Sequence, residues 1–283
     1  MGMKRMIYRI AKLLNHNSFI GIESGAKQEC LIMGKGIAFG KKIGQTIEVP
    51  QDARIYSLKE LTDRGDAREI INSVSPICLE LANEILREAE AEFGEIDRSI
   101  LFPIADHLDF AIRRLQRGEQ ISNPLTEDIR ILFYKEYKVA GCIAPMLKEK
   151  FQIELDEHET GYIALHVHSA IVDEKVSQAM EIARTVRECI SLVEKETGNS
   201  IDVMSLAYNR LMNHVRYMVA RTIHGEKLKM NLNDYMSVKF PEAFHASERI
   251  CREMEKRLGL PMPDIEIGYL AMHLERMLDS ETE

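Results

Sequence analysis

Tryptophan is missing from this chain of 283 residues, and proline and glycine are scarce, with 8 and 16 copies. Few turn-forming residues together with 15 methionines favour helices over a turn-rich all-β fold. Long apolar runs are missing too. The candidate stretch, residues 161–172, is free of formal charges for only 12 residues and contains two histidines. We therefore expect no membrane-spanning helix and no membrane insertion.

The chain has no C-x-x-C pair, and its five cysteines are dispersed. They are Cys30, Cys78, Cys142, Cys189 and Cys251. An odd, scattered set argues against a disulfide framework or a zinc ribbon and is typical of reduced thiols. Arg9 and Lys12 interrupt the apolar residues near the N-terminus, and no small-residue cleavage site follows, so a signal peptide is not predicted. A cytoplasmic location is the expectation.

Positive charge is in deficit overall, with 37 Lys and Arg against 45 Asp and Glu, a net charge of −8. Taken whole, this balance argues against a nucleic-acid binder. The charge is unevenly spread, however. Residues 1–47 hold eight basic and two acidic residues, a net +6, which leaves −14 for residues 48–283. A basic head joined to an acidic body suggests that the head contacts an anionic partner, with a solvated strand surface as the alternative.

The basic head also has its own period. Residues 8–13 alternate between apolar and polar, as a strand with one wet face does, and short apolar runs follow at 19–22 and 30–33. Ser24-Gly25 lies between these runs, where a hairpin turn needs a residue tolerant of positive φ. We expect a small antiparallel sheet over residues 1–58. So small a domain buries little core alone, which favours pairing with a second copy.

From about residue 66 the pattern is helical, and it is duplicated with an offset of 107 residues. The octapeptide E-T-G-Y-I-A-L-H at 159–166 returns as E-I-G-Y-L-A-M-H at 266–273. The same offset carries Phe110 onto Tyr217 and Phe133 onto Phe240 without any gap. We therefore predict two homologous all-α helical-bundle domains, at 67–172 and 173–283, after an all-β head.

Each copy holds two histidines 59 residues apart, His107 and His166 in the first and His214 and His273 in the second. Core histidines bonded to backbone carbonyls are one interpretation. No carboxylate or cysteine stands at a recognisable metal-ligand spacing, so neither a metal nor another cofactor is predicted. Phosphoryl acceptance fits better, because a neutral imidazole is a nucleophile and its product adds negative charge.

Arg114 and Arg221 follow His107 and His214 by seven residues, about two turns along the same helical face. Each arginine could pair with a phosphate on the histidine. A surface salt bridge is the alternative for both.

The segments I-A-K-L-L-N-H-N at 10–17 and I-M-G-K-G-I-A-F-G-K-K at 32–42 resemble the RNA-binding head of the BglG/SacY family of bacterial transcriptional antiterminators. The two helical repeats resemble that family's phosphotransferase-system regulation domains, or PRDs. The resemblance covers the head and both repeats. It looks closest to the glucose-type branch, with β-glucoside or sucrose control as alternatives.

By this resemblance, a set of head residues binds RNA. The set is Lys12, Asn15, Asn17, Gly34, Lys35, Gly36 and Phe39. The asparagines would contact bases or sugars, the lysines the backbone, and the glycines would allow close approach. Phe39 would contact a base, with the sheet core as its alternative place. Lys35 stands where many relatives have Arg; lysine keeps the charge but lacks the planar fork of a guanidinium, so a bidentate contact with a base is not expected there. His16 stands where Asn is common in relatives.

The resemblance also implies partners and a mechanism. A homodimer of heads would bind a leader-mRNA hairpin that overlaps a terminator. His107 and His166 match the phosphorylation sites of the first PRD, and His214 and His273 those of the second; His168 is an additional histidine. A sugar-specific enzyme II would phosphorylate the first PRD, and the phosphocarrier HPr the second.

The chain is thus expected to be a binding and signalling protein and not an enzyme. A histidine-dependent metal-binding hydrolase in the helical body is the alternative from another class. A third interpretation is an RNA-binding protein whose repeats no longer respond to phosphate.

Overall fold

The computed structural model describes residues 6–25, 27–59, 61–62, 65–172, 174–198, 201, 205–226 and 228–279. It separates into two compact units. The first unit comprises Met1–Ser122 and Lys135–Lys175, and the second comprises Asn123–Tyr134 and Val176–Glu283. Each unit is described by itself.

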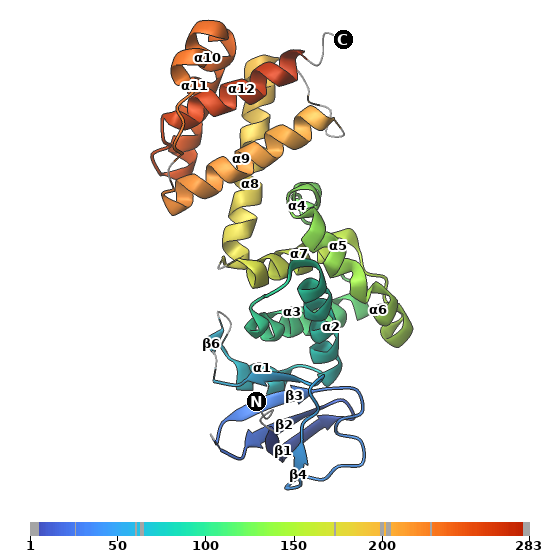
Figure 1. Ribbon diagram of the computed structural model, residues 1–283. Coiled ribbons are helices and arrows are strands. Elements are labelled where there is room, and N and C mark those ends of the chain that lie inside the picture. Colours follow the sequence, from blue (N-terminus) through green and yellow to red (C-terminus); the bar gives the residue numbers. More distant parts are fainter. Residues whose placement is uncertain are drawn as a thin grey trace. The chain divides into compact units, whose positions relative to one another are not determined.

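The head is a five-stranded antiparallel sheet with the strand order β4-β1-β2-β3-β5 (Figure 1). Its strands are β1 (Ile7–Asn15), β2 (Ser18–Glu23), β3 (Glu29–Met33), β4 (Thr46–Glu48) and β5 (Arg54–Ser57). Tyr8 and Ile10 of β1 point into the core while Ile7 and Arg9 are exposed, so the predicted alternation is confirmed. Phe19, Cys30 and Ile32 complete the centre of this core.

A turn joins β2 and β3 and includes Ser24 and Gly25, as the sequence predicts. The expectation that glycine supplies the positive φ there is wrong. Gly25 does not have a positive φ, and Lys27 takes the left-handed conformation instead, with φ 53°. Its backbone N–H donates to the carbonyl of Glu23 at 3.2 Å, and this bond closes the turn around a residue that is not glycine.

Two short strands, β6 (Leu61–Thr62) and β7 (Gly65–Asp66), form an antiparallel pair that leads into the helices of the first unit. These helices are α1 (Ala67–Ser73), α2 (Pro76–Phe93), α3 (Leu101–Gln116), α5 (Tyr134–Ala140), α6 (Ala144–Phe151) and α7 (Glu157–Ile171), with 3-10 turns η1 (Arg98–Ile100) and η2 (Gly141–Ile143). Pro76 begins α2 because its missing N–H costs nothing in a first turn.

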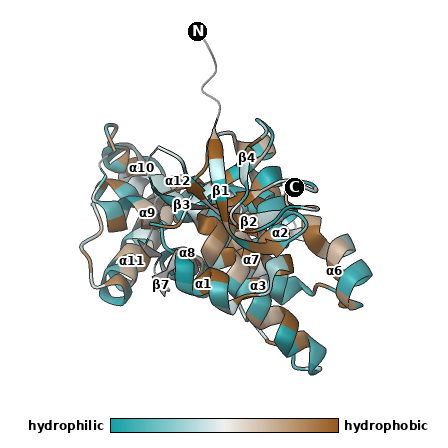
Figure 2. Ribbon diagram, turned by 90° about the horizontal axis from the view of Figure 1, so that it is seen from below, coloured by the Kyte–Doolittle hydropathy of each residue, from teal (hydrophilic) through white to brown (hydrophobic). Residues whose placement is uncertain are grey.

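The second unit contains α4 (Thr126–Leu132), α8 (Val176–Thr197), α9 (Leu206–His224), α10 (Asn233–Lys239), α11 (Pro241–Leu258) and α12 (Ile265–Asp279). Ser205 caps α9 by accepting from the N–H of Tyr208. Gly225 and Gly259 end α9 and α11 in the left-handed conformation. Figure 2 shows brown and teal residues on the same helices, as expected of helices with one face in a core.

The offset of 107 residues holds at the level of whole elements. Shifted by 107, α4 falls on α10, and the span from α5 to α6 falls on α11. The second copy thus has one continuous helix, α11, where the first copy has α5 and α6 separated by the 3-10 turn η2. The interruption coincides with Pro145, which lacks an N–H for the helix ladder and whose ring crowds the preceding turn.

The two copies also differ in where the matched short helices pack. Helix α10 packs on α11 and α12 of its own repeat, whereas α4 packs on α8 and α9. Arg187 of α8 donates to the buried carboxylate of Asp128 at 3.1 Å, and Arg216 of α9 lies over the Phe133 ring at 5.6 Å. The matching position in the repeat therefore does not determine which neighbours this helix takes.

Together these elements form an all-β head followed by all-α domains, and the predicted fold class is confirmed. No helix in the described part of the chain has the length and apolar character needed to cross a bilayer.

Candidate functional site

The RNA-binding residues expected from the sequence come from two segments that the sheet brings together. Lys12 and Asn15 lie on β1, Asn17 lies in the turn to β2, and the loop after β3 carries residues 34–39. The N–H of Gly34 donates to the carbonyl of Asn17 at 2.9 Å, and the N–H of Ala38 donates to the carbonyl of His16 at 3.0 Å. The turn and the loop thus form one continuous rim of the sheet.

The two asparagines organise this rim through their side-chain oxygens. Oδ1 of Asn15 accepts from the N–H of Asn17 and from the hydroxyl of Ser18, both at 2.9 Å. Oδ1 of Asn17 accepts from the N–H of Gly36 at 2.8 Å. Because the acceptor atoms are occupied, each amide must present its Nδ2 donors away from the loop.

Phe39 lies on the surface, with 68 % of its area exposed, so the alternative that places it in the sheet core is wrong. Its ring and the His16 ring are nearly perpendicular, with centroids 5.3 Å apart. Lys35 and Gly36 are exposed beside it. Gly36 has φ +67° and open space where a Cβ would stand, which leaves room for another molecule to approach the backbone.

Helices α1 and α2 supply residues to this rim that sequence reasoning missed. Oε1 of Glu80 accepts from Nδ2 of both Asn15 and Asn17, at 2.8 and 3.0 Å. Nζ of Lys12 donates to Oδ1 of Asn72 at 2.8 Å. No sequence signal identifies these partners, because the contact depends on how the helices pack against the sheet.

The two histidines of the first repeat, His107 on α3 and His166 on α7, lie next to each other. The rings of His107 and His166 have centroids 5.4 Å apart, and Tyr162 lies 6.0 Å from His107. Nε2 of His107 lies 3.2 Å from Oε2 of Glu159, whose side chain is fully buried. The other oxygen of Glu159 makes an ion pair with Arg114.

The second repeat forms the same pair between α9 and α12. The rings of His214 and His273 stack with centroids 4.4 Å apart, and Tyr269 stacks on His214 at 6.3 Å. Nε2 of His214 is buried and has no hydrogen-bond partner among the described residues. Burial, reinforced by His273 and Arg221, lowers the pKa of His214 to about 3. The pKa of His273 is lowered too, mainly by burial.

Both arginines occupy ion pairs, as the salt-bridge alternative predicts, but these pairs are not on the surface. Arg221 binds Glu266 through two parallel hydrogen bonds, of 2.7 and 2.8 Å, and Glu266 is 1 % exposed. Arg114 pairs with the buried Glu159. Neither guanidinium is therefore immediately available to a phosphate. The glutamates open the duplicated octapeptides, so the repeat itself carried the signal that could have identified them.

His168 follows His166 by two residues on α7, so it points away from the pair, and it lies between two carboxylates. Its Nδ1 is 3.0 Å from Glu136, and its Nε2 is 3.5 Å from Glu174. The offset of 107 places Glu275 at the matching position of the second repeat, so this arrangement belongs to the first repeat alone.

Metal ligands and cysteines are the remaining residue types that could carry chemistry. Within the described residues, no three His, Cys, Asp or Glu side chains gather in a way that could hold a metal ion. The five cysteines are free thiols, and four of them are buried.

Comparisons with known protein families match almost every part of this architecture. The CAT RNA binding domain matches residues 8–64, and the PRD domain matches twice, at residues 70–170 and 187–277. A crystal structure of GlcT CAT-PRDI has a TM-score of 0.50 and 28 % sequence identity, and the match covers 59 % of this chain and 99 % of that one.

Three similar curated proteins span nearly the whole chain. Transcription antiterminator LicT of Bacillus subtilis is 27 % identical, covering 95 % of this chain and 99 % of LicT. Protein GlcT of Staphylococcus haemolyticus is 26 % identical, covering 94 % and 95 %. The beta-glucoside operon antiterminator of Dickeya chrysanthemi is 26 % identical, covering 95 % and 96 %. The alternative of a metal-dependent hydrolase finds no support among these relatives. The expected family is confirmed: the chain belongs to the transcription antiterminators that join a CAT RNA binding domain to two PRD domains.

Proposed function

We propose that this chain is a sugar-responsive antiterminator that binds a leader-mRNA hairpin through its head and thereby prevents formation of a terminator. The observation that carries this proposal is the single rim on which Asn15, Asn17 and the loop with Lys35 and Phe39 meet. Relatives named GlcT support the glucose-type branch.

Each rim residue has a chemical role in this proposal. The Nδ2 donors of Asn15 and Asn17 bind acceptors on bases or sugars, and Lys12 and Lys35 bind phosphates. Gly34 and Gly36 let the RNA backbone approach, and the exposed ring of Phe39 stacks on an unpaired base. A single-stranded loop or bulge within the hairpin suits this set, because stacking needs bases that are splayed out.

The organisation of the chain follows the same proposal. Residues 1–58 form the RNA-binding domain, 67–172 the first PRD and 173–283 the second. Two heads act as a homodimer, because one head has a core of only a few large side chains. The protein works in the cytoplasm, where leader transcripts and phosphocarriers occur together.

Control comes from phosphorylation of His107, His166, His214 and His273. A neutral imidazole nitrogen attacks the phosphorus, and the donor leaves with the electron pair of the broken bond. The lowered pKa values of His214 and His273 keep both rings neutral near pH 7, which the nucleophile requires. A sugar-specific enzyme II phosphorylates the first PRD and inactivates the protein, and HPr phosphorylates the second.

Phosphate placed beside these histidines adds charge next to a buried glutamate. In the first repeat it competes with Glu159 for Arg114, and in the second with Glu266 for Arg221. Either exchange moves a buried ion pair between α3 and α7 or between α9 and α12, which biases the packing of the whole repeat.

Filter binding of the full chain at moderate salt tests the RNA function, since low salt inflates non-specific phosphate contacts. We expect the antiterminator hairpin to bind at least about tenfold more tightly than a scrambled stem-loop of equal length. Equal affinity for both RNAs would rule out antitermination by this head.

A separate reaction tests the control. The full chain is incubated with enzyme I, HPr and phosphoenolpyruvate, with and without an enzyme II. Labelling that disappears in the His214→Ala and His273→Ala double variant supports the second PRD as the HPr target. If the chain stays unlabelled under all conditions, the third interpretation holds: the protein binds RNA, but its repeats no longer respond to phosphate.

A further inference from the structure

The side-chain amides of the RNA-binding rim are already bound, and their ligand is a carboxylate. One oxygen of Glu80 accepts from Nδ2 of Asn15 at 2.8 Å and from Nδ2 of Asn17 at 3.0 Å. The orientation of both amides is determined, because each Oδ1 already accepts a backbone N–H. Glu80 therefore occupies the donor face that RNA would need.

A carboxylate is a chemical substitute for the RNA groups expected at this place. Phosphate oxygens, base carbonyls and sugar hydroxyls all accept hydrogen bonds, and the first of these also carries negative charge. Lys12 is occupied in the same way, because its Nζ donates to Oδ1 of Asn72 in α1 at 2.8 Å. Three of the seven proposed RNA ligands are thus bound by helices of the first PRD.

The contact continues along one face of α2 beyond Glu80. Asn83, three residues on, accepts from the hydroxyl of Tyr56 in β5 at 2.7 Å. Glu90, seven residues further, makes ion pairs with Arg54 and, at 2.5 Å, with Arg98. Spacings of three and seven residues place these side chains on the same side of a helix. A polar stripe of α2 therefore lies along the head.

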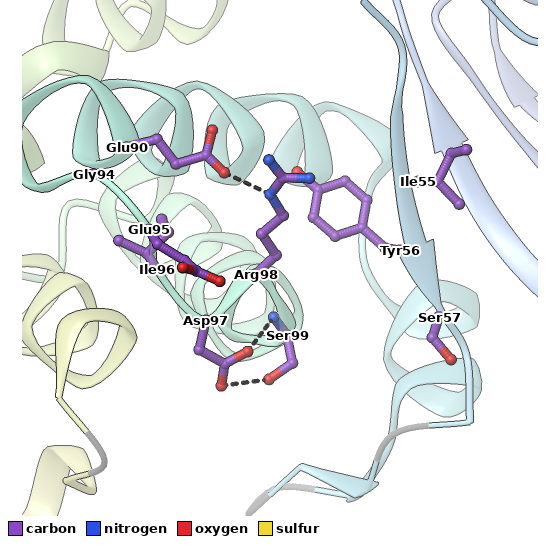
Figure 3. A pocket seen from close by; sticks show the side chains of 10 residues that line it. All are labelled: Ile55, Tyr56, Ser57, Glu90, Gly94, Glu95, Ile96, Asp97, Arg98 and Ser99. Atoms are coloured by element: carbon purple, nitrogen blue, oxygen red, sulfur yellow. Dashed lines mark hydrogen bonds and ion pairs between the residues drawn. The ribbon is translucent and has the colours of Figure 1, made fainter. Parts of the chain in front are cut away.

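The junction is mainly polar and partly open, with one apolar contact in which the buried Tyr56 ring meets the Phe102 ring of α3 at a centroid distance of 6.4 Å. A cleft of about 670 Å3 lies between β5 and the end of α2, lined by Tyr56, Glu90 and Arg98 (Figure 3). Figure 3 shows Arg98 reaching from η1 towards Glu90 beside the Tyr56 ring. Interfaces with this character separate more readily than hydrophobic cores do.

We propose that α2 is a built-in competitor of the RNA, docked on the RNA-binding rim of its own head through Glu80, and that the hairpin must displace it to bind. This inference rests on the proposed function, because it takes Asn15 and Asn17 as RNA ligands. Lys35, Gly36 and Phe39 remain exposed in the docked arrangement and offer the first contact to an incoming hairpin.

The test measures hairpin affinity of the full chain with Glu80→Ala. Removing a charged partner of two hydrogen bonds is expected to tighten binding by roughly tenfold. Glu88→Ala is the matched control, because Glu88 lies on the same helix, carries the same charge and has its ion-pair partner, Arg87, on that helix at 4.0 Å. Its affinity should equal that of the unaltered chain.

A second variant, Asn83→Ala, distinguishes docking of α2 on the head from simple charge repulsion between Glu80 and the RNA. Asn83 is uncharged and is not a proposed RNA ligand, but it holds α2 to Tyr56. If α2 blocks the rim, this variant also binds the hairpin several-fold more tightly. Unchanged affinity in Glu80→Ala, or in Asn83→Ala, would overturn the competitor model.

Failure of the proposed function would look different. In that case neither the unaltered chain nor any variant would prefer the antiterminator hairpin over the scrambled stem-loop. Melting temperatures of all variants, compared with that of the unaltered chain, report whether a change in affinity reflects docking or loss of fold. Tighter hairpin binding in a variant that melts normally supports docking.

Discussion

Arg221 holds Glu266 through two parallel hydrogen bonds, from Nε to Oε1 at 2.7 Å and from Nη2 to Oε2 at 2.8 Å. The pair joins α9 to α12, the same two helices that carry the stacked rings of His214 and His273. In the first repeat the matching glutamate, Glu159, is shared between an arginine and a histidine. The two repeats therefore use one buried carboxylate in two ways, and the histidines beside it differ in their surroundings.

Replacing Glu266 by Gln should strongly destabilise the second unit. The substitution leaves the guanidinium of Arg221, whose side chain is only 17 % exposed, without its buried counter-charge, which costs up to about 3–5 kcal/mol. Urea unfolding monitored on the second unit of the full chain gives the change in the free energy of unfolding. Glu253→Gln is the control, because Glu253 lies in exposed pairs with Lys256 and Arg257 on α11 and should cost less than about 1 kcal/mol. Equal losses in both variants would show that the Glu266 pair has no special weight.

Acid should destabilise the second unit through His214. Its folded-state pKa of about 3 lies below the ordinary value of 6.5, so between these values the unfolded chain binds more protons than the folded one. The free energy of unfolding is unaffected by this group above pH 6.5 and falls as the pH drops below it, by up to roughly 1.4 kcal/mol per pH unit.

Unfolding of the unaltered chain and of His214→Gln at pH 7 and pH 5 measures this effect. The unaltered chain should lose about 1–2 kcal/mol more than the variant between the two pH values. His273, whose pKa is also lowered mainly by burial, accounts for part of the slope that persists in the variant. An identical pH dependence in both proteins would contradict the buried, neutral state of His214.

Phe39→Ala should weaken hairpin binding without changing stability. The exposed ring contributes little to the head core, while base stacking on an aromatic side chain is worth about 1–3 kcal/mol. Ile43→Ala is a matched control, since Ile43 follows in the same segment, is 67 % exposed and is not among the proposed RNA ligands. Affinity and melting temperature are measured for both. A loss of affinity as large in Ile43→Ala as in Phe39→Ala would point to general disturbance of the loop.

Much of this architecture is predictable from local patterns. The alternation at residues 8–13 predicts β1, and the 107-residue offset predicts the helical repeat so closely that α4 falls on α10. The pairing of His107 with His166 follows from the same repeat. These features depend on the spacing of apolar residues and on the match between the two repeats, and both can be seen in the sequence itself.

Features that depend on packing between distant segments escape such reasoning. Glu80 looks like any helical surface glutamate until α2 is placed against the sheet. The neighbours of α4 differ from those of its repeat partner α10, although the two helices match in position. Lys27 adopts the positive φ that the sequence predicts for Gly25, two residues earlier, because the turn geometry, and not residue preference alone, decides which position is left-handed.

Gly268→Ala should dislodge α10 from α12. A Cβ on Gly268 would lie 2.6 Å from Oδ1 of Asn233 and 2.9 Å from backbone atoms of residues 232 and 233, which cannot rotate away. The N–H of Gly268 also donates to that same Oδ1 at 3.0 Å, so the close approach is part of the helix contact. Overpacking of this kind typically costs about 1–3 kcal/mol.

Gly141→Ala is its control. No atom lies within 4 Å of a Cβ built on Gly141, and its φ is not positive, so the substitution should be neutral or stabilise by about 0.4–1 kcal/mol through reduced entropy of the unfolded chain. Urea unfolding of the two variants compares these effects, and hydrogen exchange at α10 reports local release of the helix in Gly268→Ala. If α10 stays as protected in Gly268→Ala as in the unaltered chain, the glycine is not what allows the two helices to pack so closely.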